Sequence, residues 1–255
     1  MNDPSSPLIL PSSTMLKFTV PGTNFTYQGA AVAGLTSFEH TVALGLFDES
    51  GSTSAYAKLM EKCCGSIVKA LRHSPAAAKL LYGQYHYDTH FREFHGFKPL
   101  RECNEADYDG CWAGGGKTTQ YDSEDKAISF VEDYAKQQAK MHYTCNGIIW
   151  EITDGQDWGS ILREADVKKR YAKALSSEEL ESLMFILIGV NDDPDVQNEL
   201  QRHATECNFT QYIPLTKADE KTLAALAGFI VKSTLSQSQH LGTGGPSQPL
   251  PPPKF

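Results

Sequence analysis

The sequence predicts a doubly wound α/β fold, with a mostly parallel central sheet and helices on both of its faces. Short apolar runs alternate with longer amphipathic stretches along the middle of the chain, which is typical of this class. The runs at 41–47 and 184–190 are nearly continuously apolar, as in strands that are buried on both faces. With 255 residues, 40% of them hydrophobic, the chain can bury one substantial core.

The elements are assigned in order from their patterns. Strand-like residues with Gly and Pro breaks in 15–38 predict an added β-hairpin. Strands are predicted where apolar, β-branched and aromatic residues run together, and helices where apolar residues recur every three or four positions. The predicted strands of the main sheet are 41–47, 79–87, its partner 91–97, 147–153, 184–190 and 212–214. The predicted helices are 54–72, 123–142, 160–182, one that starts near residue 194, and 217–236.

Composition divides the chain into four segments. Residues 1–13 are rich in Pro and Ser, and we expect a flexible N-terminus there. We expect the β-hairpin extension over 14–40 and the main α/β domain over 41–236. Residues 237–255 become rich in Gly, Ser and Pro, which predicts a disordered tail.

Charge and hydropathy exclude several classes of partner. Lys and Arg number 23 against 31 Asp and Glu, a formal net charge of −8, so the chain repels phosphate backbones and we expect no nucleic-acid partner. No apolar run reaches the length of a membrane span, and the polar first residues lack a signal-peptide core. We therefore expect a cytoplasmic protein. Its six cysteines form no C-x-x-C pair and are expected to be buried, reduced thiols.

Three polar clusters lie at or near predicted strand ends. They are residues 48–52 after the first buried strand, the threonines of a Gly-rich loop at 114–119, and 154–155 after the strand at 147–153. Ligands of parallel sheets bind at the carboxyl ends of the strands, so we expect these clusters to lie close together. Because they supply oxygen ligands and neither His nor Cys, the sequence predicts a Mg²⁺ site, with Mn²⁺ or Ca²⁺ as alternatives.

These residues resemble a known family. Asp-x-Ser-Gly-Ser after a buried strand, a Thr in a Gly-rich loop and Thr-Asp-Gly after a later strand are similar to the metal-ion-dependent adhesion site of von Willebrand factor A (VWA) domains. The resemblance covers residues 40–236, roughly the whole predicted main domain. It implies metal ligands at Asp48, Ser50, Ser52, Thr118 and Asp154, with Thr119 as the alternative to Thr118.

The resemblance also implies a function. VWA domains of this kind use the cation to bind an acidic residue of another protein, so we expect a protein–protein interaction module, an adaptor or scaffold, and not an enzyme. The partner would supply an Asp or Glu to the metal. Intracellular VWA proteins often act in multiprotein assemblies, some beside AAA+ ATPases, and the resemblance extends this expectation to the present chain.

Other interpretations compete with this one. A metal-dependent hydrolase of phosphoesters or nucleotides would use the same site, with Glu49 as general base, although we expect Glu49 to be a solvated or supporting carboxylate. Ser50 and Ser52 would, in the simplest interpretation, only cap the next helix. Residues 116–118 end like a P-loop, but the pattern needs Gly where Cys111 stands, and no buried strand precedes it.

Three histidines, His86, His90 and His95, lie close together in the sequence. On a strand their spacing puts the first two on one face and the third on the other, so they cannot converge on one zinc ion. We expect an exposed hairpin there instead.

Overall fold

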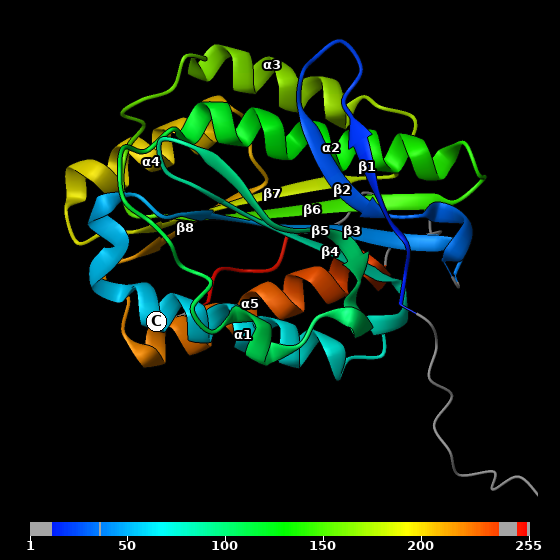
Figure 1. The fold of residues 1–255 in the computed structure, drawn as a ribbon. Coiled ribbons are helices and arrows are strands. Elements are labelled where there is room, and N and C mark those ends of the chain that lie inside the picture. The colour runs from blue at the N-terminus through cyan, green and yellow to red at the C-terminus, as the bar shows by residue number, and fades with distance from the viewer. Residues whose placement is uncertain (1–11, 36, 240–248, 254–255) are drawn as a thin grey trace, which may run out of the picture.

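The structure, a computed structural model, describes residues 12–35, 37–239 and 249–253. Within these residues one eight-stranded sheet forms the middle layer and helices cover it above and below (Figure 1). The strands lie in the order β1-β2-β5-β4-β3-β6-β7-β8. Their bounds are β1 (Met15–Thr19), β2 (Thr26–Ala30), β3 (Glu39–Asp48), β4 (Leu80–Tyr87), β5 (Phe91–Pro99), β6 (Thr144–Thr153), β7 (Leu183–Val190) and β8 (Gln211–Leu215). The α-helices are α1 (Ala57–Arg72), α2 (Gln120–Ala139), α3 (Glu164–Leu175), α4 (Pro194–Glu206) and α5 (Glu220–Gln239).

The middle of the sheet is parallel. β3 pairs with β4 and β6, β6 pairs with β7, and β7 pairs with β8, all in parallel, whereas β5 runs antiparallel to β4. The β1–β2 hairpin joins the β5 edge through one pair, Gly29 opposite Phe97. The predicted mostly parallel sheet with an N-terminal hairpin is therefore confirmed. The loops that follow β3, β6 and β7 emerge at the same edge of the sheet.

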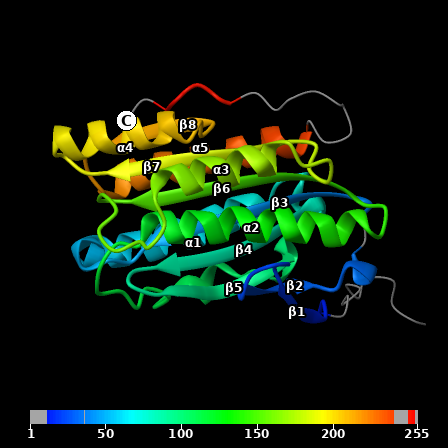
Figure 2. The same cartoon turned by 90° about the horizontal axis from the view of Figure 1, so that it is seen from above.

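Each face of the sheet buries its own apolar layer. On β6, Ile149 packs in the cluster that includes α2, α3 and α4, whereas Ile148 and Trp150 pack in the cluster that includes α1 and α5. Because neighbouring residues of a strand point to opposite faces, a strand covered on both faces is apolar at nearly every position. Figures 1 and 2 show the two helical layers, with α2, α3 and α4 on one side of the sheet and α1 and α5 on the other.

The predicted elements of the main sheet and its helices are present, with shifted ends. The helix predicted over 54–72 begins as a 3-10 segment (Gly51–Tyr56) before α1. The helix predicted over 160–182 is shorter, because the backbone N–H groups of Ile161 and Leu162 donate to the Asp122 carboxylate and residues 155–163 form a loop before α3. α5 continues to Gln239, beyond its predicted end.

The chain ends are described in part. Of the N-terminus predicted to be flexible, residues 12 and 13 are described, and the Ser13 hydroxyl donates to Glu102 at 2.9 Å. Residues 240–248 and 254–255 of the predicted tail lie outside the described residues. Residues 249–253 lie beside α5, and the Leu250 carbonyl accepts a hydrogen bond from the Gln211 amide at 3.0 Å.

Two further expectations concern the whole chain. All six cysteines are buried free thiols, as predicted. Among the helices in the described ranges, none combines the length and apolar character that a membrane crossing needs.

Candidate metal centre

Three loops meet at the carboxyl ends of β3 and β6. The Ser52 hydroxyl, from the loop after β3, donates to Asp154 Oδ1 at 2.8 Å, directly after β6. A backbone hydrogen bond of 3.2 Å from Gly51 to Gly116 joins the first loop to the Gly-rich loop. Another of 2.9 Å joins the Gly-rich loop to the loop after β6. The structure therefore brings together the three segments that the sequence singled out.

Asp48 is the most deeply buried acidic residue of this group, at 1% exposure. Its Oδ1 accepts the Ser50 backbone N–H at 2.8 Å, and its Oδ2 accepts the Thr153 hydroxyl at 2.6 Å. Burial raises the pKa of Asp48 to about 6, against the lowering effect of these hydrogen bonds, and the charge of Asp154 adds to the rise. The ionised carboxylate is therefore held in a place that disfavours its charge.

Asp48 and Asp154 have no cationic partner in the part of the chain that the structure describes. They are 1% and 7% exposed, and among the described residues no Lys, Arg or His lies within ion-pair distance of either. The buried hydroxyl of Tyr56 lies beside Asp154, and burial, then the charge of Asp154 and a hydrogen bond with it, raise the pKa of Tyr56. Two uncompensated carboxylates with hydroxyl oxygens around them fit a hard divalent cation and its bound water.

The two threonines of the Gly-rich loop differ in their contacts. The Thr119 hydroxyl donates to the Asp88 carbonyl at 2.6 Å and so holds the start of α2 against the end of β4. The Thr118 hydroxyl makes no hydrogen bond to any described residue, although the side chain is 7% exposed. Thr118 is therefore the better candidate for a metal ligand, and Thr119 has a structural role.

Valine substitutions separate these roles. Thr118→Val is expected to weaken Mg²⁺ binding about tenfold, with a change in the free energy of unfolding below about 0.5 kcal/mol in chelator. Thr119→Val loses the hydrogen bond to Asp88, so it is expected to lower the free energy of unfolding by about 1 kcal/mol with little effect on Mg²⁺ affinity. Calorimetric titration and urea denaturation measure the two quantities. The opposite pattern would make Thr119 the ligand.

Glu49 does not face the metal centre as a free base. It is 4% exposed, and its Oε1 accepts hydrogen bonds from His86, from Arg92 at 2.5 Å and from the Ala113 backbone at 3.2 Å. Burial acts to raise the pKa of Glu49, but the hydrogen bond with His86 and the charges of His86 and Arg92 outweigh it and hold the pKa below its usual value. Of the two environments expected for Glu49, a solvated or a supporting carboxylate, the solvated one is wrong. Glu49 instead ties the Gly-rich loop to β4 and β5.

The histidines of β4 and β5 have three different environments. His86 is fully buried, so the expected exposed hairpin is wrong at that position. The His90 side chain is 88% exposed, and His95 bonds to the Tyr108 hydroxyl at 2.8 Å. In the described ranges no group of three or more His, Cys, Asp or Glu side chains is arranged to hold a metal.

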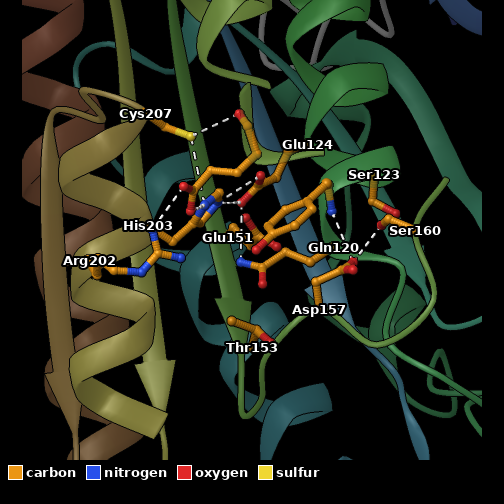
Figure 3. A network of polar contacts seen from close by, with 12 residues as sticks. Gln120, Ser123, Glu124, Glu151, Thr153, Asp157, Ser160, Arg202, His203 and Cys207 are labelled. Carbon is orange, nitrogen blue, oxygen red and sulfur yellow. Dashed lines mark hydrogen bonds and ion pairs between the residues drawn. The ribbon is translucent and has the colours of Figure 1, made fainter. Parts of the chain in front are cut away.

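A buried polar network lies beneath the metal centre, between β6, α2 and α4 (Figure 3). His203 Nε2 is 2.9 Å from Glu124 Oε1, and its Nδ1 is 3.0 Å from Glu164 Oε2. An imidazole that donates from both nitrogens is charged. Burial acts to lower the pKa of His203, but the Glu124 charge and further hydrogen bonds raise it to about 12. Burial and then the Glu124 charge raise the pKa of Glu151, which accepts the Tyr87 hydroxyl at 2.5 Å.

The sequence analysis does not predict this polar network. Glu151 precedes Thr153 by two residues, so both side chains lie on the same face of β6. Thr153 donates its hydroxyl to Asp48, and Glu151 is therefore the next side chain on that face, further from the strand end. A lone acidic residue inside an apolar strand was the available signal. Nothing in the helical patterns distinguished Glu124 or His203 from solvated residues of a helix.

Solved structures provide the informative comparison, because the sequence matches no known family profile and no curated protein. The PilB minor pilin from Streptococcus sanguinis has a TM-score of 0.54 at 11% identity, over 81% of this chain and 64% of that one. The pilus adhesin SpaC from Lactobacillus rhamnosus GG has a TM-score of 0.56 at 10% identity, over 92% of this chain and 36% of that one. These likenesses show a shared fold.

A third neighbour is proximal thread matrix protein 1 from the mussel byssus. It matches with a TM-score of 0.49 at 18% identity, over 76% of this chain and 45% of that one, in a structure described as having a zinc-occupied MIDAS motif. The chain spans less than two thirds of the length of each of these three proteins.

Proposed function

We propose that this chain is a VWA-type adhesion module that binds Mg²⁺ through Asp48, Ser50, Ser52, Thr118 and Asp154 and uses the cation to bind an acidic residue of a protein partner. The observation that carries the proposal is the pair of buried carboxylates at neighbouring strand ends, with no cationic side chain of the described residues beside them. Leaving such charges uncompensated is costly, so a resident cation is the simplest account of their presence.

The proposed ligands would contribute either negative charge or neutral oxygen atoms to the cation. Asp48 and Asp154 together balance a divalent cation, while Ser50, Ser52 and Thr118 contribute neutral oxygens. The bound cation supplies a positive charge with a coordination position that a carboxylate of the partner can take. The partner's carboxylate would take the position that these oxygens leave open, so it would bind the cation without displacing a residue of this chain. Mn²⁺ and Ca²⁺ remain the competing ions for the same oxygen set.

Hydrolysis at this site has less support. Activation of water needs a base near the cation, and Glu49 is engaged by His86, Arg92 and the Ala113 backbone. We therefore propose an adaptor or scaffold and not a hydrolase. The likenesses to the PilB pilin and the SpaC adhesin do not point to an AAA+ ATPase as the partner.

Metal-dependent capture tests the proposal. Immobilised protein is expected to retain specific partners in Mg²⁺ and to release them in EDTA, because the partner's carboxylate binds through the cation. Asp48→Ala should retain none of them in either buffer. Glu178→Ala, which changes an exposed acidic residue between α3 and β7, should behave as wild type. A partner that remains bound through both EDTA and Asp48→Ala would exclude this mechanism.

A further inference from the structure

The loop between β6 and α3, residues 155–163, presents two large apolar side chains to solvent. Trp158 is 75% exposed and Ile161 is 91% exposed, the two highest values among the exposed large hydrophobic residues that the structure describes. The loop starts directly after Asp154, so it flanks the candidate metal centre.

The backbone of this loop is fixed by hydrogen bonds to the segment that carries Thr118. The Trp158 N–H donates to the Thr118 carbonyl at 2.9 Å. The Asp122 carboxylate, in the first turn of α2, accepts the backbone N–H groups of Ile161 at 3.1 Å and Leu162 at 2.8 Å. The backbone that carries the two apolar side chains is thus held in place by Thr118 and by the first turn of α2.

Side chains within the loop add to this rigidity. The Ser160 hydroxyl donates to Asp157 and accepts the Asp122 N–H at 3.1 Å, and Figure 3 shows Ser160 and Asp157 next to the start of α2. A Cβ at Gly159 would lie 3.2 Å from the Thr119 methyl group, so the loop packs closely on the Gly-rich loop. A preorganised loop loses little conformational entropy when a partner binds to it.

The other side of the centre has the opposite character. Asn191, in the loop after β7, donates to the Asp154 carbonyl at 2.6 Å. The same loop and the first turn of α4 expose Asp192, Asp193 and Asp195. An incoming segment therefore meets apolar side chains on the side of the β6–α3 loop and negative charge on the side of β7. Rigid exposed Trp side chains are frequent anchors of protein interfaces, whereas further carboxylates of a partner would be repelled by the β7 side.

We infer that the acidic residue recognised at the metal centre lies in a protein segment with apolar side chains beside it, which pack on Trp158 and Ile161. The segment carries no second acidic residue towards the β7 side. This inference rests on the proposed function and specifies the partner of that site.

Short fluorescent peptides test the inference in saturating Mg²⁺. One peptide has a single Glu among glycines, the second has Leu on both sides of that Glu, and the third has Gln in place of Glu in the Leu-flanked sequence. Wild type is expected to bind the Leu-flanked Glu peptide about tenfold more tightly than the Gly-flanked one, because apolar area is buried on the loop. The Gln peptide should not bind.

The variant that combines Trp158→Ala with Ile161→Ala should lose this preference while keeping wild-type affinity for Mg²⁺ and for the Gly-flanked peptide. Phe38→Ala removes a ring that is 72% exposed at the opposite end of β3, and it should keep the preference. Equal affinities of wild type for the two Glu peptides, or a preference that survives in the double variant, would overturn the inference and leave the proposed function standing. Failure of both Glu peptides to bind the Mg²⁺-loaded chain would overturn both.

Discussion

Replacing His203 with Gln is expected to lower the free energy of unfolding by about 3–5 kcal/mol near pH 6. The imidazolium lies between two carboxylates, 2.9 Å from Glu124 and 3.0 Å from Glu164, and is 2% exposed. Glutamine keeps a polar side chain but removes the charge, which leaves fully buried Glu124 beside Glu151 without its counterion. Urea denaturation followed by circular dichroism measures the loss.

The pH dependence of this loss identifies its origin. Burial acts to lower the pKa of His203, but the Glu124 charge and the hydrogen bonds raise it from 6.5 to about 12. A group whose pKa rises on folding contributes its full stabilisation below its unfolded pKa and loses it as the pH rises towards its folded pKa. The difference between wild type and His203→Gln should therefore be largest near pH 6. It should narrow above that by up to about 1.4 kcal/mol per pH unit.

Two further variants serve as controls for His203→Gln. His90→Gln changes a side chain that is 88% exposed and is expected to alter the free energy of unfolding by less than about 0.5 kcal/mol. Adding Glu124→Gln to His203→Gln removes the uncompensated carboxylate. The double variant should therefore have a free energy of unfolding higher than that of His203→Gln by about 1 kcal/mol or more. A loss below about 1 kcal/mol for His203→Gln, or a difference that widens from about pH 6 to about pH 9, would contradict a charged His203.

The fold could be predicted because a strand that is buried on both faces of the sheet has a continuously apolar sequence. β7 is buried at every position from Leu183 to Val190, and its sequence is correspondingly apolar throughout. No comparable sequence pattern indicates the irregular loop before α3. Its boundary is set by Asp122, which lies in another helix and takes the N–H groups that an earlier helix start would use.

The sequence predicts which loops form the candidate site, but it does not predict which threonine hydroxyl is free to bind a metal. Parallel strands end at a common edge, so the segments that hold Asp48 and Asp154 had to meet. Thr118 and Thr119 are the same residue type in adjacent positions, and the hydrogen bond to Asp88 is what separates them. The hydrogen bond from Arg92 to Glu49 likewise depends on the pairing of β4 with β5. The residues next to Glu49 in the sequence do not indicate this contact.

Asp48→Asn is expected to weaken Mg²⁺ binding about a hundredfold or more, since removing a charged ligand costs at least as much as removing a group that merely supports one. In EDTA the same variant should be as stable as wild type or more stable. The amide can keep both contacts of the carboxylate, as acceptor for the Ser50 N–H and as donor to the Thr153 hydroxyl oxygen. The substitution also removes a buried charge that lies near Asp154 and has no cationic partner within residues 12–35, 37–239 and 249–253.

Thermal unfolding with and without Mg²⁺ measures both effects at once. Wild type should gain about 2.7 kcal/mol of stability when the free ion is at a hundred times its dissociation constant, whereas Asp48→Asn should gain almost nothing at that concentration. Asp192→Asn, an exposed substitution at the same edge of the sheet, should respond to Mg²⁺ as wild type does. If Asp48→Asn unfolded far more easily than wild type in EDTA, Asp48 would be a structural residue of the β3 end. A stabilised variant that no longer responds to Mg²⁺ would instead mean that this carboxylate is retained at a cost to the fold because it holds the cation.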